Sequence, residues 1–218
     1  MLTIAISSRS LFSLEKENEI FEREGQQAFD DHMQVTENDS LEPGAAFALV
    51  SKLLALNSAR GDGKRDRVEV VLLSRNSCAA GMRVMNSVHQ HGLDITQSVF
   101  TGGGDRFRYA HALDADLFLC TEPSDAKKAL DIGVAAASLI PGGHTPGSDD
   151  IVRIAFDGDA VLFSGEADDI FREHGLAKFV NNELLHANTP LGAGPFKRLL
   201  TKMFDILPHL SLRLPLAR

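Results

Sequence analysis

Two patterns of apolar and polar positions alternate along the chain. Apolar, β-branched runs such as VEVVLL and DLFLC predict buried β-strands, because strands covered on both faces have no polar side. Between them, segments such as AAGMRVMNSVHQHG have the spacing of amphipathic helices, with Gly92 as a helix stop. Strands that alternate with helices form a mainly parallel sheet, so we predict a doubly wound α/β fold.

The pattern at the start of the chain occurs a second time. Residues 4–57 match the residues 150 positions further on without a gap. Each copy predicts a strand, an acidic helical segment that ends at a glycine, a Gly/Pro turn and an amphipathic helix. We interpret this as an internal duplication whose second copy is incomplete. The identical pairs are Ile4/Ile154, Ala5/Ala155, Ile20/Ile170, Phe21/Phe171, Gly25/Gly175, Phe29/Phe179, Asn38/Asn188, Leu41/Leu191, Gly44/Gly194, Leu49/Leu199 and Lys52/Lys202.

The repeat divides the chain into four segments. Residues 1–141 form a first, complete α/β repeat, and residues 142–150, GGHTPGSDD, form a linker. Residues 151–207 are the start of the second repeat, with its first strand, a helical segment and one further helix. We expect the remaining strands of the second domain to be missing. The apolar tail, 208–218, fits neither copy and leaves the oligomeric state open, a homo-oligomer included.

Composition narrows the class of protein. With 44% hydrophobic and 24% charged residues the chain has enough apolar side chains for a core. A net charge of −8 argues against a nucleic-acid partner. No signal peptide and no membrane-spanning run is evident, so we expect a soluble, cytoplasmic protein without a membrane partner. Cys78 and Cys120 have no zinc-type spacing, and we expect both to be buried packing thiols.

Candidate chemistry lies in IAFDGDAVLF, where Asp157 and Asp159 follow a predicted strand, VRIAF. Ligands bind beyond the carboxyl ends of parallel strands, and Gly158 would let another group approach the backbone closely. Two neighbouring carboxylates repel each other unless a cation such as Mg²⁺ neutralises them. The alternative is a solvated Asp-Gly turn, but the apolar residues on both sides favour a catalytic site.

RIAFDGDAVLFS resembles the first motif of haloacid-dehalogenase-type phosphatases. The chain as a whole resembles the cytosolic 5′-nucleotidase I family, through LTIAISSRSLF, LEPGAAFALVSKLLALN, VEVVLLSRNS, HGLDITQSVFTGGG, ADLFLC and RIAFDGDAVLFS. The resemblance implies a nucleoside monophosphate substrate, Asp157 as nucleophile and Asp159 as general acid/base. It implies that both are Mg²⁺ ligands, Asp159 through its backbone carbonyl. It also implies that the stretch from about 166 to 193 is a cap over the substrate.

The chain departs from that family in both copies. The family's second Ser/Thr, its lysine and its acidic pair follow the DGD motif, and this chain ends before any of them. The first copy has Ser7 and Arg9 in place of the two acids, so we expect it to be a scaffold. An arrangement in which Asp157 uses Ser74, Arg106 and Glu122 of the first copy is a less favoured alternative.

Two segments of the first copy could either bind phosphate or have a purely structural role. Ser74 ends a predicted strand and is either a phosphate contact, which with Gly158 would bind the substrate, or a plain polar strand terminus. TGGGD, residues 101–105, either binds phosphate through its backbone N–H groups or is a simple turn, which we favour.

The sequence thus predicts Mg²⁺-dependent hydrolysis of nucleoside 5′-monophosphates through an aspartyl-phosphate. Because the family's later catalytic residues are missing, we expect this activity to be weak or lost in the chain as it stands. One alternative is a non-catalytic fragment that folds and associates with a partner or a full-length relative. The other is a related phosphatase that acts on a different small phosphate ester.

Overall fold

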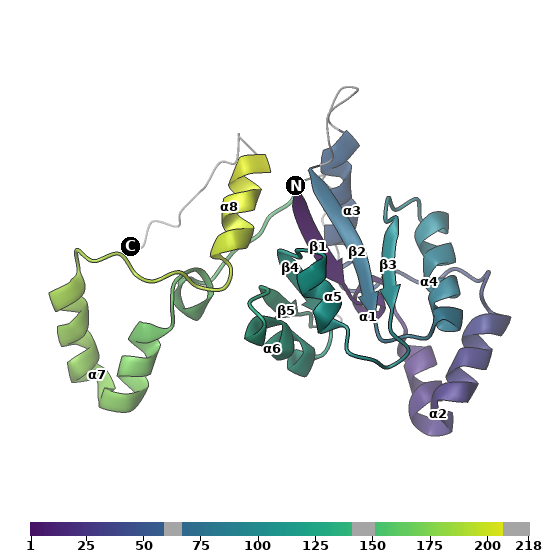
Figure 1. Ribbon diagram of the computed structural model, residues 1–218, viewed down its shortest axis with the longest axis horizontal. Helices are drawn as coiled ribbons and strands as arrows, with labels where there is room; N and C mark the ends of the chain where they lie inside the picture. Colours follow the sequence, from purple (N-terminus) through teal and green to yellow (C-terminus); the bar gives the residue numbers. More distant parts are fainter. Residues whose placement is uncertain (59–66, 141–150, 207–218) are drawn as a thin grey trace. The chain divides into compact units, whose positions relative to one another are not determined.

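The computed structural model describes residues 1–58, 67–140 and 151–206 (Figure 1). The chain divides into two compact units, one over Thr3–Ile154 and one that begins at Ala155. The predicted linker, 142–150, and the predicted tail, 208–218, lie outside the described residues. Within the described ranges, no helix is both long enough and apolar enough to cross a membrane.

The first unit is built on a five-stranded sheet in the order β3-β2-β1-β4-β5. The pairs β1–β4, β2–β3 and β4–β5 are parallel, which confirms the predicted parallel sheet. This order places β1 in the centre, as in doubly wound nucleotide-binding folds. The strands are β1 (Leu2–Ile6), β2 (Val68–Ser74), β3 (Gln97–Phe100), β4 (Leu117–Cys120) and β5 (Ala136–Ser138).

Helices flank this sheet and confirm the predicted α/β class. Helix α3 packs on β2, α2 contacts α4, and α6 packs on β4 and β5. In Figure 1, α5 and α6 pass in front of the sheet. The helices are α1 (Ser8–Leu11), α2 (Glu15–Val35), α3 (Phe47–Ser58), α4 (Cys78–Gln90), α5 (Phe107–Ala112) and α6 (Pro123–Asp131).

Polar residues follow the buried strands at one edge of the sheet. Ile6 lies opposite Leu119, and Ser74 lies opposite Phe100, so parallel strands β1, β2 and β4 end at the same edge. Ser7, Ser74 and Thr121 therefore gather there. Above this edge, α2 is bent at Gly25, which has a φ of 86° that favours glycine.

The second unit contains a π-helical turn, η1 (Gly158–Leu162), followed by α7 (Glu166–His186) and α8 (Lys197–Ile206). Helix α8 buries Leu199, Met203 and Ile206, whereas α7 buries no residue. The predicted strand before Asp157 is wrong for this structure, because residues 151–157 are irregular. A strand needs a hydrogen-bonding neighbour, and residues 155–206 form no other strand to pair with.

The duplication is visible in the backbone hydrogen bonds of the two copies. Gly44 N–H donates to Leu11 O at 2.8 Å, and Gly194 N–H donates to Leu162 O at 3.0 Å. The antiparallel bridges Phe12–Pro43 and Phe163–Ala193 correspond in the same way. Each copy also bends its long helix at a left-handed glycine, Gly175 in the second copy with a φ of 75°.

The structural register also corrects the gap-free match. Gly44 and Gly194 are 150 positions apart, but their acceptors Leu11 and Leu162 are 151 apart. The second copy therefore has one extra residue just after the DGD motif. Between Leu162 and Gly175 the second copy has one residue fewer than the first copy has between Leu11 and Gly25. The offset between the two copies is therefore 150 again at Gly25 and Gly175.

Candidate functional site

Asp157 and Asp159 lie at the start of η1 in the second unit. Asp157 is the N-cap residue, and its Oδ1 accepts a hydrogen bond from Gly158 N–H at 2.7 Å. Both aspartates are exposed. The structure thus brings the two carboxylates to one short turn that solvent and a ligand can both reach.

The extra residue of the second copy accounts for the shape of this turn. In the first copy, Phe12 N–H donates to Ser8 O at 2.9 Å, which closes an ordinary α-helical turn. In the second copy, Phe163 N–H donates to Gly158 O at 3.0 Å, one residue further along the chain. Ala160 takes up the insertion with a φ of 57°. Such π-turns are frequent at functional sites.

The donor chemistry at this turn fits a hard divalent cation. Carboxylate oxygens are the ligands that Mg²⁺ prefers, and it keeps several waters beside one or two carboxylates. Across the three described ranges, no group of three or more His, Cys, Asp or Glu side chains gathers around a common point. Asp157 and Asp159 would therefore hold such an ion together with water and substrate oxygens.

Ser7 and Arg9 occupy the equivalent positions in the first unit. Ser7 caps α1, and its hydroxyl lies 2.7 Å from the hydroxyl of Ser10. The Arg9 guanidinium contacts Glu122 at 3.3 Å and Glu15 at 3.2 Å. A hydroxyl and a cation thus stand where the second copy has two carboxylates.

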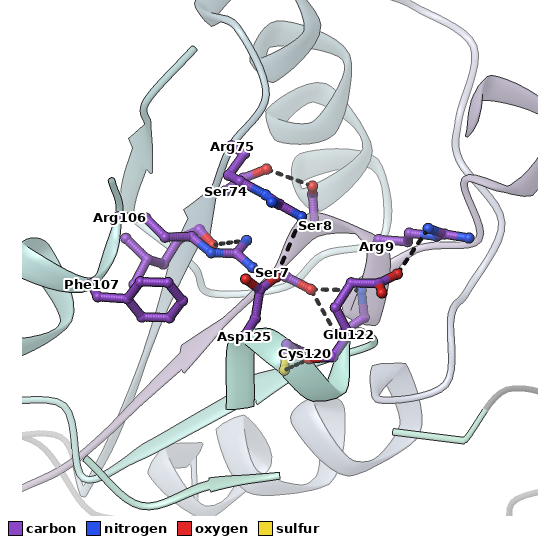
Figure 2. A network of polar contacts seen from close by, with 12 residues as sticks. Ser7, Ser8, Arg9, Ser74, Arg75, Arg106, Phe107, Cys120, Glu122 and Asp125 are labelled. Atoms are coloured by element: carbon purple, nitrogen blue, oxygen red, sulfur yellow. Dashed lines mark hydrogen bonds and ion pairs between the residues drawn. The ribbon is translucent and has the colours of Figure 1, made fainter. Parts of the chain in front are cut away.

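Ser74 lies beside Ser8 at the carboxyl edge of the sheet (Figure 2). The two hydroxyls are 2.8 Å apart, and Asn76 N–H donates to Ser74 Oγ at 3.2 Å. The Asn76 amide also donates to Ser8 Oγ at 3.3 Å. Ser74 is therefore a member of a polar network in the first unit.

A buried ion pair between Arg106 and Asp125 lies next to this network. The Arg106 guanidinium donates to Asp125 and, at 3.3 Å, to the Leu73 carbonyl, and its charge lies 5.1 Å from the Phe118 ring. Arg75 reaches the same Asp125 carboxylate at 3.4 Å. Burial lowers the pKa of Arg106, while Asp125 acts in the opposite direction. The guanidinium remains charged, because its ordinary pKa lies far above neutral pH.

The glycine-rich loop after β3 is a structural turn, as favoured from the sequence. Gly103 N–H donates to the Arg75 carbonyl at 2.7 Å, and Gly102 N–H donates to the Asn76 carbonyl at 2.9 Å. These two N–H groups are engaged within the protein and hold the loop against residues 75–76. They do not form a phosphate cradle.

The prediction for the two cysteines is half right. Cys120 is buried, and burial raises the pKa of its thiol to about 11, so the thiol is neutral at neutral pH. Cys78 is exposed, contrary to the prediction. It is the first residue of α4, next to the N-cap Ser77, where a side chain faces solvent rather than the core.

A pocket of about 340 Å³ opens at the carboxyl edge of the first unit's sheet. Sequence reasoning named Ser74, Arg106 and Glu122 but missed Asp125 and the α2 side chains. Asp125 sits in the first turn of a helix, where an acid is usually solvated, so no sequence signal marked it as buried. The residues that line the pocket are Ser7, Ser8, Arg9, Leu14, Asn18, Phe21, Gln26, Phe29, Ser74, Arg75, Asn76, Gly103, Arg106, Thr121, Glu122 and Asp125.

Comparison with known proteins identifies the family. The sequence profile of the 5′-nucleotidase family matches residues 1–211. Human cytosolic 5′-nucleotidase 1B is 36% identical over 203 residues, which cover 91% of this chain and 33% of that protein. The chain thus spans about a third of the length of this relative. No solved structure matches it. The resemblance to the cytosolic 5′-nucleotidases I is confirmed, and the chain belongs to the 5′-nucleotidase family.

Proposed function

We propose that this chain acts in the cytoplasm in the Mg²⁺-dependent hydrolysis of nucleoside 5′-monophosphates, with its chemistry at Asp157 and Asp159. The observation that carries the proposal is the family match over residues 1–211, which includes the DGD motif. The name of the human relative, a cytosolic 5′-nucleotidase, supports the same reaction and location.

The two aspartates would divide the reaction between them. A carboxylate oxygen of Asp157 attacks phosphorus, and the bond from phosphorus to the 5′ oxygen breaks. Asp159 gives a proton to the departing oxygen, which leaves the nucleoside and an aspartyl-phosphate. Asp159 then takes a proton from water, whose oxygen attacks phosphorus and releases phosphate and the Asp157 carboxylate.

Asp157 and Asp159 would also hold the metal. Asp157 would bind through its carboxylate and Asp159 through its backbone carbonyl, which leaves the Asp159 carboxyl free to transfer protons. Bound Mg²⁺ would neutralise the charge of Asp157 and of the phosphate, so that an anionic nucleophile can approach an anionic phosphate. Gly158 lies between the two acids and has no side chain to obstruct a phosphate oxygen near its backbone. The exposure of both aspartates is compatible with a substrate that arrives from solvent.

A second candidate is a non-catalytic segment that associates with another protein. The observation in its favour is the surface of α7, where Phe171, Leu176, Leu184 and Leu185 are exposed. Apolar side chains gathered on one helix are typical of an interaction surface. A phosphatase acting on another small phosphate ester would use the same two aspartates.

Phosphate release separates these candidates. We expect the 218-residue chain to release phosphate from AMP only with Mg²⁺. Asp157→Asn should abolish release, and Asp159→Asn should slow it by about a hundredfold. Asp205→Asn, an exposed acid of α8 in the same unit but outside the expected cap, should have little effect.

Other outcomes identify the alternatives. A folded chain that releases no phosphate from any phosphate ester would favour the associating segment. Turnover of sugar phosphates but not nucleotides would favour the other phosphatase.

A further inference from the structure

We infer that the pocket in the first unit is a second nucleotide-binding site, one that holds its ligand without hydrolysing it. The predicted role of this copy was that of a scaffold. Its pocket, however, is built from charged and aromatic side chains at the edge of the sheet where parallel folds bind ligands. The inference does not depend on the activity proposed for Asp157.

The charges of the pocket favour an anion. Arg9, Arg75 and Arg106 line it. Arg9 is paired with two acids, whereas Arg75 and Arg106 share the single carboxylate of Asp125, which leaves one cation in excess at that side of the pocket. Asp125 is held between two of these arginines and cannot neutralise both. Arginines that gather at one place are the usual partners of phosphate groups.

Hydrogen-bond donors in the pocket lack an acceptor. The Nε atoms of Arg106 and Arg9 are buried and have no hydrogen-bond partner within the described parts of the chain. The Arg106 side chain is only 5% exposed, so solvent does not compensate for this. Buried donors without partners are costly, so these two arginines have hydrogen-bonding capacity that the described protein groups leave unsatisfied.

The opposite wall of the pocket is suited to a planar ring. Helix α2 contributes Phe21 and Phe29, whose rings meet edge to face at 6.1 Å. Phe21 is 44% exposed, which leaves ring surface available to a ligand. Asn18 and Gln26 add side-chain amides beside the two rings. Together, the cations and the aromatic wall match a phosphate ester that carries an aromatic base. The pocket volume of about 340 Å³ lies within the range of small-ligand sites.

The same residues explain why a bound ester stays intact. Ser7 and Arg9 stand at the positions of Asp157 and Asp159, so the pocket has no carboxylate where the nucleophile would be. The Ser7 hydroxyl is engaged with Ser10, and Glu122 is paired with Arg9. The pocket therefore binds but lacks the groups for phosphoryl transfer.

Calorimetric titration in EDTA tests this site apart from the metal-dependent one. We expect AMP to bind the Asp157→Asn/Asp159→Asn chain as tightly as the unaltered chain. Arg75→Ala removes a cation that is 54% exposed and should weaken AMP binding by roughly tenfold or more. Arg108→Ala removes an exposed cation of the same unit outside the pocket lining and should leave the affinity within about twofold.

The base is tested with Phe21→Ala. This change should weaken AMP binding several-fold but leave the binding of ribose 5-phosphate unchanged, because only AMP carries an aromatic base that can stack on Phe21. The inference is overturned if the folded chain binds no AMP at millimolar concentration. It is also overturned if Arg75→Ala binds AMP like the Arg108→Ala control, or if binding disappears in the double aspartate variant.

Discussion

At the scale of single residues, Asp125 is the most constrained side chain of the first unit. Its carboxylate is 2% exposed and contacts both Arg106 and Arg75. Removal of one partner from a buried ion pair leaves the other charge without compensation. Arg106 would then be a buried cation next to an apolar core.

We therefore expect Asp125→Asn to lower the free energy of unfolding of the first unit by about 3 kcal/mol. Urea denaturation followed by tyrosine fluorescence measures this. The chain has one tyrosine and no tryptophan, and Tyr109 packs against the core of the first unit. Asp131→Asn, an exposed acid at the end of the same helix, is the control and should change little. Equal stability of the two variants would contradict a structural role for the buried pair.

Single residues were the least predictable part of the molecule. The motif marked Asp157 and Asp159 because their types and spacing are unusual after an apolar run. Nothing similar marked Asp125 or Phe21, whose importance comes from a pocket that several separate segments form together. The exposure of Cys78 was missed for the same reason, since burial depends on the face that a helix presents.

At the scale of elements, the distinctive feature is η1, where one extra residue turns an α-helical turn into a π-helical one. Ala160 has a φ of 57° there, in the left-handed region that costs a residue with a Cβ about 1 kcal/mol. Ala160→Gly should relieve that strain and stabilise the turn. The amide of Phe163, which closes the turn on Gly158, reports on it directly.

We expect hydrogen exchange at the Phe163 amide to slow by roughly fivefold in Ala160→Gly, in line with about 1 kcal/mol. Ala55→Gly is the matched control, because it makes the same substitution at an exposed position inside helix α3. It should speed exchange of the amides around it, since glycine destabilises a helix interior. Faster or unchanged exchange in Ala160→Gly would show that the turn is not strained.

Apolar runs that find a neighbouring strand in the structure were predicted well, and the run that finds none was not. The strands of the first unit and the helix stop at Gly92 follow from apolar runs and glycine positions. The run before Asp157, VRIAF, resembles the β1 sequence LTIAI but is irregular. A strand is stabilised by its neighbours: β1 lies beside β4, whereas residues 155–206 of the second copy form no strand that could pair with this run.

At the scale of the whole molecule, duplication has produced two copies with different chemistry. The second copy has two carboxylates on a short turn, and the first has arginines around a pocket. We therefore propose that phosphoryl transfer takes place at Asp157 and that the first unit binds its ligand without hydrolysing it. The sequence revealed the duplication and the loss of the acids, but not the pocket, which depends on α2 folding over the end of the sheet.

The central claim is that phosphoryl transfer takes place on Asp157. It is tested by mixing the chain with AMP labelled with radioactive phosphorus and Mg²⁺, quenching in acid within one turnover, and mapping the label by peptide digestion. We predict a label on the peptide that contains Asp157, and hydroxylamine should remove this label, as expected of an acyl-phosphate. The label should be absent from Asp157→Asn and present in Asp205→Asn, whose exposed acid lies in α8. A folded chain with no label on that peptide, or with a hydroxylamine-resistant label at Ser7, would contradict the account.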